Sequence, residues 1–506
     1  MTNKTIIAAI VSIMSATTAL AQEDTYRYAD ATQLWRLTGN AAGLALDSSA
    51  NRGVAFFDLQ HSEGDYQRVQ EGGQRNQLQF FTERYQTISP LLVGYGAFRF
   101  DMGRTENRAW CDVMRPYNSN PFFSGSSVSG KYDTQQFDLT AAVGTIRMWG
   151  FTGGLRLDYS VGDLSRLRDP RSRSELLDYK LAPSLTYSTG SHTVGIAGHY
   201  NRRKEKIPSM TTVQQDPDLK YYLMTGMEQA TGSTGGYSRE WVDHRFGAEL
   251  TYGYDNGVAK SVSSVTIERG SEDVLGTYKY EPGHYVSYRY GLTSHNRLRA
   301  ANALHQIDLT ASYEQAYADE HRQQLIQERD AEKGYTSYHY ETLITFKKRY
   351  QVKRFNADIH YRYNMVDGSA VNGYLGATAA LRQVENKHLL PTSALKYSYA
   401  DVSIEGGTAL LKKQLWLDAE AGYHHSTKAD LQLADATTDY AVGVLQPDMQ
   451  YYDADYWRGH LALTYQFPLT LKGKHTTAFV RAYGDYISAD HSLTRSTVGL
   501  SFGLFN

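Results

Sequence analysis

Charged side chains recur at every second position along several segments of this chain, interleaved with apolar ones. Arg156 and Asp158, for example, alternate with Leu155, Leu157 and Tyr159. Because successive side chains of a β-strand point to opposite faces, this spacing gathers the charged groups on one face. We predict that this face lines a hydrated interior, and its candidate pore-lining residues are Arg156, Asp158, Arg245, Glu249, Asp358, His360, Arg362, Asp418 and Glu420.

The pattern leaves two interpretations of these residues open. They can pair with one another and hold a polar interior, or they can line the path of a solute. The chain has Lys+Arg 52 against Asp+Glu 54, so the surplus of one sign that a strongly ion-selective pore needs is not visible. The net charge of −2 also lacks the basic signature of a nucleic-acid binder, and we expect no nucleic acid among the partners.

The stretch 105–131 is the most unusual connection in the sequence. It mixes arginine and aromatic residues with two prolines and a run of small residues. Such a loop could fold inward and narrow a pore, with its aromatic and guanidinium groups in contact with a solute. The alternative is a loop that caps the structure or meets a partner protein. The candidate constriction residues are Arg108, Arg115, Tyr117, Phe122 and Phe123.

Residue types that could do chemistry elsewhere form no recognisable catalytic motif. The sequence has no Gly-x-Ser-x-Gly elbow, no His-Glu-x-x-His, no P-loop and no dinucleotide fingerprint. Five aspartates in 435–456 could hold calcium, but their spacing matches no EF-hand and a solvated external loop is favoured. The single cysteine, Cys111, excludes an internal disulfide framework. We therefore predict no enzyme, no cofactor and no metal site.

The elements that position these residues must be long strands. The alternation runs for about ten residues or more, the length that a tilted membrane-spanning strand needs. Tyrosine often closes the apolar face, as in an aromatic girdle. Short connections, such as 188–191, 255–257 and Tyr350-Gln351, alternate with long polar ones at 105–131, 203–239, 319–335 and 427–455. This pattern predicts an all-β fold: a transmembrane antiparallel β-barrel with short periplasmic turns and long extracellular loops.

The predicted barrel, residues 53–506, has about 14–18 strands, and 18 is the best count. That count includes strands at 275–290, 336–349 and 353–364. It places only one strand, 394–411, in the region 365–411, where Tyr374 to Leu381 could be loop or strand. The mean hydropathy is negative, and past the N-terminus no run approaches about 18 apolar residues, which excludes a helical membrane protein.

The N-terminus indicates the compartment. Lys4, the apolar run Ile6 to Met14 and the sequence Ala19-Leu20-Ala21 are typical of a secretory signal peptide over residues 1–21. The last residues, 497–506, resemble the C-terminal signal that the outer-membrane assembly machinery reads. We therefore expect the protein in the outer membrane of a Gram-negative bacterium, with the membrane lipids and that machinery as partners.

Residues 22–52 precede the first strand and contain the sequence Asn40-Ala41-Ala42-Gly43-Leu44-Ala45. This segment resembles the one that leads into the first strand of long-chain fatty-acid transporter barrels, where it lies in the lumen as a hatch; here Ala41 replaces the family's proline. The high tyrosine content, this segment and the loop 115–125 are also similar to a Bacteroidota family of uncharacterised outer-membrane barrels. The resemblance implies that Leu34, Trp35 and Leu37 sit inside the barrel, with bends at Gly39 and Gly43. The alternative is a mobile periplasmic tail.

Together these features predict a passive or gated channel, or transporter, for a small solute. A rival interpretation belongs to a different class: a structural or docking subunit of a larger cell-surface complex. Exposed tyrosine-rich loops suit protein contacts as readily as solute contacts. In that case the partner would be another outer-membrane protein or a lipoprotein.

Overall fold

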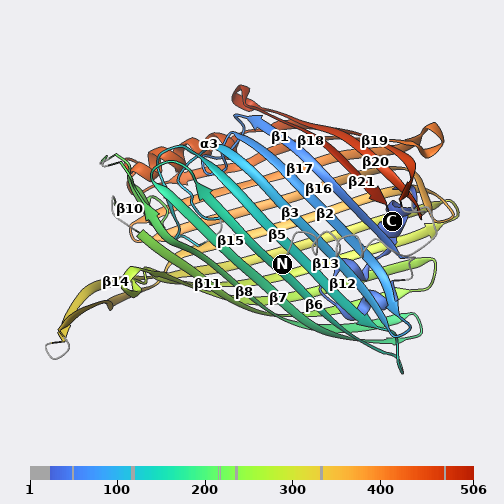
Figure 1. Cartoon of the computed structure of the whole chain (residues 1–506), viewed down its shortest axis with the longest axis horizontal. Helices are drawn as coiled ribbons and strands as arrows, with labels where there is room; N and C mark the ends of the chain where they lie inside the picture. The colour runs from blue at the N-terminus through green and yellow to red at the C-terminus, as the bar shows by residue number, and fades with distance from the viewer. Residues whose placement is uncertain are drawn as a thin grey trace.

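The computed structural model describes residues 23–47, 51–114, 120–214, 216, 218–233, 237–330, 334–471 and 474–505. Within these residues, eighteen strands form one antiparallel sheet that closes on itself as a barrel (Figure 1). Each wall strand pairs with the next one along the chain, and β1 (Arg52–Gly64) closes the ring against β21 (Thr494–Phe505). Closure leaves no open edge within the ring, as a sheet in lipid requires.

The other wall strands are β2 (Gln74–Ser89), β3 (Leu92–Arg108), β5 (Gly130–Thr145), β6 (Phe151–Arg166), β7 (Arg171–Thr189), β8 (His192–Thr211), β11 (Tyr237–Asp255), β12 (Ala259–Gly276), β13 (Gly283–Ala300), β14 (Ala303–Asp330), β15 (Tyr335–Asp367), β16 (Ala370–Leu389), β17 (Thr392–Leu410), β18 (Leu415–Gln432), β19 (Tyr456–Leu471) and β20 (Lys474–Ala489). The remaining elements are shorter: the strands β4 (Ser124–Ser126), β9 (Tyr221–Gly226) and β10 (Gln229–Ser233), and the helices α2 (Glu23–Thr32), η1 (Trp35–Leu37), η2 (Ala41–Leu46), η3 (Thr277–Lys279), η4 (Leu411–Lys413), η5 (Ala441–Leu445), α3 (Gln446–Asp453) and η6 (Asp490–Ser492). None of the helices in the described ranges is long and apolar enough to cross a bilayer.

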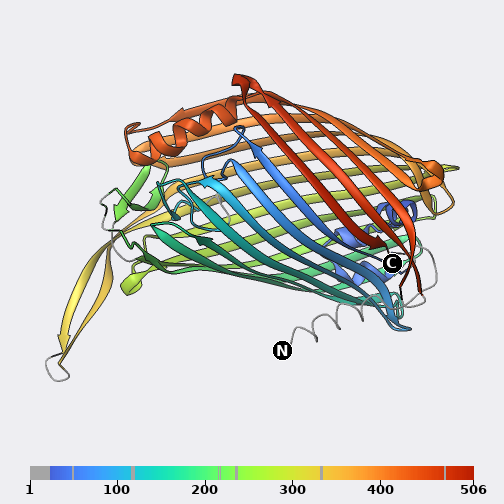
Figure 2. The ribbon, with the colours of Figure 1, turned by 45° about the horizontal axis from the view of Figure 1, so that its top comes forward.

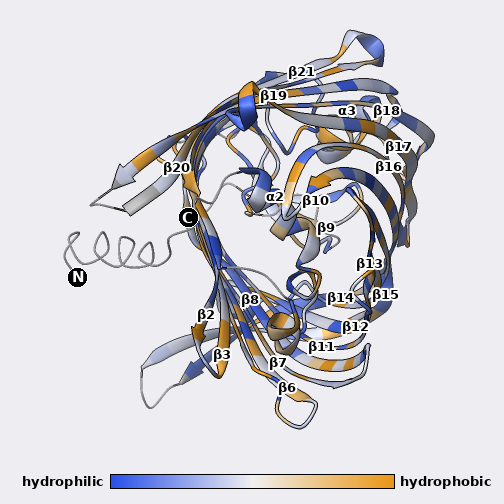
Figure 3. Ribbon diagram, turned by 90° about the vertical axis from the view of Figure 1, so that its right-hand side faces the viewer, coloured by the Kyte–Doolittle hydropathy of each residue, from blue (hydrophilic) through white to orange (hydrophobic). Residues whose placement is uncertain are grey.

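The two faces of the wall differ as the alternation predicts. Large apolar side chains on the outer face are exposed around the ring, such as Leu250 at 59% and Ile404 at 68%. The inner face carries the charged residues that alternate with them, such as Glu249, and Figure 3 shows the alternation of hydrophilic and hydrophobic residues along the strands. An apolar outside that surrounds a polar lumen is the arrangement of a membrane barrel. The chain is therefore a β-barrel of the outer membrane.

The connections sort by length between the two ends of the barrel. At the end where β1 begins and β21 ends, adjacent strands join through short turns, for example 190–191 and 256–258. At the other end lie most of the long connections, together with α3, β10 and the tip of the β14–β15 hairpin (Figures 1 and 2). In outer-membrane barrels the short turns are periplasmic, so the second end is extracellular.

Eighteen strands is the predicted number, but the prediction divided one strand in two and missed another, so that these two errors cancel in the count. The turn predicted at Tyr350-Gln351 does not exist, because β15 runs unbroken from Tyr335 to Asp367. The region 365–411 holds two strands rather than one, since 370–389 forms β16. The strand predicted at 275–290 begins instead at Gly283, after the one-turn helix η3. The predicted signal peptide, residues 1–21, lies outside the described residues.

Physical reasons explain both errors. Beyond Glu320 and before Tyr350, β14 and β15 pair only with each other and project past the rim, so neither face of the hairpin meets lipid. Without a lipid-facing side, the apolar-polar alternation that marks a wall strand weakens. β16 was missed for a different reason, because its outer face carries small residues, Ala377 and Ala379, and gives only a weak apolar signal.

Candidate functional site: the lumen and the segment inside it

The nine candidate pore-lining residues all lie on the inner face, and among the described residues each contacts a polar partner. Arg156 binds Asp158 at 2.9 Å, and Arg458 donates to Glu420 at 2.7 Å. Strand register brings together residues far apart in sequence: the guanidinium of Arg362 donates two hydrogen bonds to Glu405, at 2.8 and 2.9 Å. His360 contacts the same carboxylate at 2.7 Å, and Asp358 accepts from Thr310 at 3.0 Å. These pairs hold a charged yet balanced lumen.

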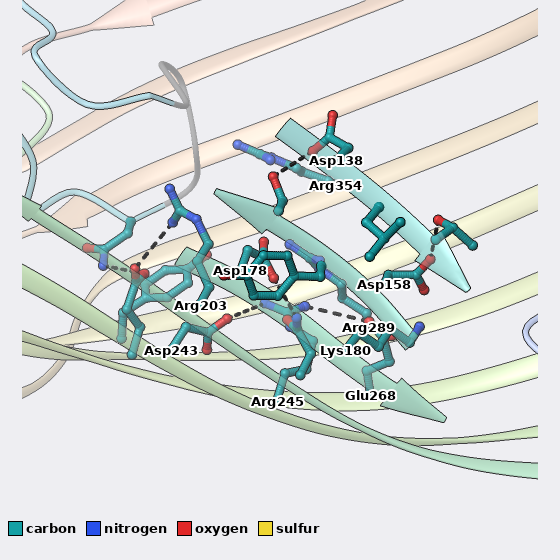
Figure 4. Close-up of a pocket in the computed structure, with 18 residues that line it drawn as sticks. Asp138, Asp158, Asp178, Lys180, Arg203, Asp243, Arg245, Glu268, Arg289 and Arg354 are labelled. Atoms are coloured by element: carbon teal, nitrogen blue, oxygen red, sulfur yellow. Dashed lines mark hydrogen bonds and ion pairs between the residues drawn. The ribbon is translucent and has the colours of Figure 1, made fainter. Parts of the chain in front are cut away.

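A cavity of about 370 Å³ lies in the lumen, lined by charged residues of several neighbouring strands (Figure 4). Asp138, Asp158 and Asp178 line it from the adjacent strands β5, β6 and β7. Arg245 and Arg289 line it from β11 and β13. Carboxylates and guanidinium groups around one cavity can bind polar groups of either sign. Of the nine predicted residues, Asp158 and Arg245 line this cavity; that they contact a solute stays a prediction.

Glu249 and Asp418 have a different position from the one expected for pore-lining groups. Both bind the residues that precede the barrel, here called the luminal segment (residues 23–47). The backbone N–H of Gly39 donates to Glu249 at 3.2 Å. Arg27 donates two hydrogen bonds to Asp418, at 2.9 and 2.8 Å. The luminal segment is thus attached to opposite parts of the wall, and Figure 3 shows α2 inside the ring.

Further polar contacts fix the ends of the luminal segment. Lys260 on β12 binds Asp47 at 2.9 Å, and Lys413 binds Asp24 at 2.9 Å. Asp47 in turn accepts from the backbone N–H of Trp35 at 3.2 Å, which ties the two short helices together. Each charge-assisted hydrogen bond contributes about 1.5–3 kcal/mol where it is shielded from water.

Several residues of the wall that contact the luminal segment are glycines. An ideal Cβ added at Gly154 on β6 would lie 2.6 Å from Cα of Ala42, and one at Gly144 would lie 2.7 Å from the carbonyl oxygen of Ala41. At Gly253 on β11 a Cβ would lie 2.6 Å from the indole ring of Trp35. Any larger residue would displace the segment. The close approach of backbone to backbone therefore requires glycine at these wall positions.

The three candidate hatch residues differ in burial. Leu34 is fully buried and Trp35 is 3% exposed, packed with Val262 of the wall. Leu37 is 41% exposed, because a single helical turn buries one face and Leu37 ends that turn on its exposed side. That these three residues act as a hatch stays a prediction.

Gly39 lies in the bend between η1 and η2, as predicted, whereas Gly43 lies within η2. Neither glycine has a positive φ. Both glycines allow close approach, since a Cβ would lie 2.5 Å from Oε2 of Glu249 at Gly39 and 2.8 Å from Cγ of Trp35 at Gly43.

The loop after β3 folds into the extracellular mouth of the barrel. Arg108 is buried and donates to the carbonyl oxygens of Cys111 and Val113, at 3.0 and 2.6 Å. Phe122 is 1% exposed, and its carbonyl oxygen accepts from the indole of Trp241 at 2.6 Å. Phe123 packs edge-on against Tyr440 with the ring centroids 6.1 Å apart. Arg115 and Tyr117 lie outside the described residues. The loop thus lies inside the mouth, and its contact with a solute stays a prediction.

Two other extracellular connections complete this cap. The small sheet of β4, β9 and β10 lies within the ring (Figure 3). The stretch 435–456 forms η5 and α3 rather than an open loop, and its aspartates are used within the fold: Asp448 accepts from the backbone of Val69 at 2.8 Å. Within the described ranges no three His, Cys, Asp or Glu residues cluster as metal ligands would.

Burial in the cap moves the pKa of two side chains further above physiological pH. It raises the pKa of the Cys111 thiol and raises the pKa of the Tyr440 hydroxyl well above its ordinary value. Both groups are therefore neutral at physiological pH. A buried neutral thiol is inert, and Cys111 is a packing residue of the cap.

Sequence reasoning missed the residues that seat the luminal segment. Lys260 and the wall glycines carry no motif, and their role follows only from the register that brings β5, β6, β11 and β12 past residues 35–47. A small signal was present: Gly144 and Gly154 fall on the inward parity of their strands, where polar residues otherwise dominate.

A model of a family of unknown function, DUF6850, matches residues 41–506 of the chain. The match covers the whole barrel and part of the luminal segment. No curated protein matches the sequence. The similarities to long-chain fatty-acid transporters and to a Bacteroidota family stay predictions.

Among solved structures, the copper transporter OprC has a TM-score of 0.39 at 10% identity; the match covers 89% of this chain and 81% of that one. The siderophore receptor PirA from Acinetobacter baumannii has a TM-score of 0.39 at 8% identity, with coverage of 90% and 81%. The outer membrane protein opdK from Pseudomonas aeruginosa has a TM-score of 0.36 at 8% identity, with coverage of 90% and 99%.

Proposed function

The chain belongs to DUF6850, a family of unknown function, and we propose that it is a gated outer-membrane channel for a small solute with polar or charged groups. The luminal segment is the gate and the charged lumen is the path. The observation that carries this proposal is the seat of the segment, which combines polar contacts to Glu249 and Asp418 with a glycine-paved wall. A mobile periplasmic tail would not require a surface on the wall that is complementary to it.

The character of these contacts suits a gate better than a permanent part of the wall. The segment is joined to the barrel by side-chain hydrogen bonds, ion pairs and packing, and not by β-pairing with the wall strands. Such contacts exchange with water when the segment moves, because the lumen around them is polar. The wall can therefore stay closed as a barrel while the segment leaves its seat.

Deleting residues 23–47 tests the proposal directly. The barrel strands do not depend on this segment for pairing, so the shortened protein should refold with β-rich circular dichroism. In planar bilayers it should conduct more than the full chain, and it should make cells more sensitive to bulky antibiotics. Equal conductance and equal sensitivity, with both proteins folded, would show that the segment is not a gate.

A second candidate function, a docking subunit of a larger surface complex, is favoured by the β14–β15 hairpin. After Glu320 in β14 and before Tyr350 in β15, the two strands pair with no other strand in the described residues. The tip of this hairpin projects beyond the rim (Figure 1). Leu325, Leu343 and Ile344 are exposed there. Exposed strand edges with apolar side chains are suited to pairing with another protein. A barrel silent in bilayers that copurifies stoichiometrically with another outer-membrane protein or lipoprotein would favour this function.

A further inference from the structure

A second cavity, of about 620 Å³, lies between α2 and the inner wall. From the residues around it we infer that the barrel binds there a small organic monoanion with an apolar body, through the Arg481 guanidinium and a wall of phenylalanine rings. This inference rests on the proposed channel function and deepens it by naming the chemical class of the solute.

One side of the cavity is aromatic, although the lumen elsewhere is polar. Phe81, Phe56 and Phe479 point inward from β2, β1 and β20. Their rings pack in sequence, with centroids 5.3 Å apart between Phe56 and Phe81 and 6.4 Å apart between Phe56 and Phe479. Phe505 of β21 and Tyr26 of α2 extend this wall. The ring centroid of Phe505 lies 4.8 Å from that of Phe479 and 5.5 Å from that of Tyr26. Such a surface binds an apolar or aromatic body.

A cation without an ion pair stands beside the aromatic wall. Arg481 follows Phe479 by two positions on the inner face of β20 and lines the same cavity. Within the described ranges it forms no ion pair, and its Nε has no hydrogen-bond partner. Its one ring contact is with Tyr483, at 5.8 Å from the ring centroid.

Each carboxylate around the cavity already has at least one partner. Arg27 binds Glu23 through Oε1 and also binds Asp418; Oε2 of Glu23 has no hydrogen-bond partner in the described residues, and its charge interacts with Arg481 without a direct ion pair. The remaining four have partners as well: Asp30 binds Arg36, Glu405 binds Arg362, Glu420 binds Arg458, and Asp58 accepts from the hydroxyls of Tyr483 and Ser501. Arg481 is thus the cation that is left for the anionic group of a ligand.

The shape and the charges together define the ligand class. A guanidinium binds a carboxylate or a phosphate oxygen pair through two parallel hydrogen bonds. Arg481 and Phe479 lie two residues apart on the inner face of β20, about 7 Å along the strand. A ligand whose anionic group binds Arg481 can therefore place its apolar body against the rings. Asp58 and Glu420 on the same cavity disfavour a second negative charge on the ligand. The volume lies in the range of about 300–1,000 Å³ that is typical of small-molecule sites.

Isothermal titration calorimetry on the full barrel in neutral detergent tests this site with three probes. Phenylpropionate carries both features, phenylpropylamine has the same body with a cation, and propionate has the anion alone. We expect phenylpropionate to bind at least about tenfold more tightly than either of the others. The variant Arg481→Gln should lose about tenfold in this affinity, and Phe81→Ala should also weaken it.

The matched control is Arg382→Gln. Arg382 is also a luminal arginine, but it is paired with Asp358 and lines neither cavity, so its removal should leave phenylpropionate binding unchanged. Equal binding of phenylpropylamine, or wild-type affinity in Arg481→Gln, would overturn the site. Calorimetry measures binding and does not depend on transport through the barrel, so the binding site and the channel function are tested independently. If residues 23–47 prove not to be a gate while Arg481→Gln loses the probe, the channel proposal fails and the site stands.

Discussion

Replacing Gly154 by alanine should unseat the luminal segment without disturbing the barrel. The added Cβ would lie 2.6 Å from Cα of Ala42, well inside van der Waals contact. Relief requires the segment to move, which also strains two hydrogen bonds: Ala42 N–H to Ser184 at 3.0 Å and Thr152 to the carbonyl oxygen of Ala42 at 2.8 Å. Overpacking costs about 1–3 kcal/mol and a strained hydrogen bond about 0.5–1.5 kcal/mol.

The total penalty on the seated state is therefore about 2–6 kcal/mol, which raises the unseated fraction by about 30- to 20,000-fold. Trypsin cleavage within residues 23–47 of the folded barrel measures this fraction, because proteolysis follows the population of the open form when reclosing is fast. The rate should rise by that factor. Pairing of Gly154 with Ser184 in the wall persists, so the barrel itself should remain folded.

The adjacent residue supplies the control. Gly153 lies on the same strand and faces outward, and nothing lies within 4 Å of a Cβ built there. Gly153→Ala should leave cleavage at the wild-type rate, since alanine is at least as favourable as glycine in a strand. If Gly154→Ala and Gly153→Ala are cleaved alike, the segment is not seated on this wall and the reasoning fails.

Two further predictions concern the faces of the wall and the cap. Arginine at Ile359, on the lipid face, should cost about 2–4 kcal/mol in urea titrations of the barrel in liposomes, whereas arginine at Asn356 on the lumen face should cost little; equal costs would contradict the face assignment. Cys111 should react with a thiol reagent at pH 8 at least about a hundredfold more slowly in the folded protein than in urea, because burial raises its pKa and blocks access; equal rates would show that the cap is open.

The barrel itself was predictable because the alternation is local. A strand with lipid on one side and water on the other shows it within about ten residues, and Leu155 to Tyr159 illustrate it without any knowledge of the neighbours. The apolar-polar alternation weakens where a strand does not have lipid on one side and water on the other, or where its lipid-facing residues are small. This is why β15 was divided at Tyr350-Gln351, where its projecting part meets the wall, and why β16, with Ala377 and Ala379 outside, was missed.

The site was predictable only in part, because partners depend on register. Alternation placed Arg362 and Asp418 in the lumen, yet their partners Glu405 and Arg27 lie far away in sequence. The residue types of the luminal segment indicated burial of Trp35, but the glycines that receive it lie on distant strands. Nothing local in the sequence links Gly253 to Trp35.

A reversible lock on the luminal segment tests the central claim most directly. A Cβ at Gly195 would lie 3.5 Å from Cγ of Asn40, so cysteines at both positions are within reach of a disulfide. The double variant, Asn40→Cys with Gly195→Cys, should show no openings in planar bilayers when oxidised and should open again on reduction, while Cys111 stays buried in both states. Openings at the same frequency and conductance in the oxidised and reduced forms would contradict the claim that residues 23–47 gate the barrel.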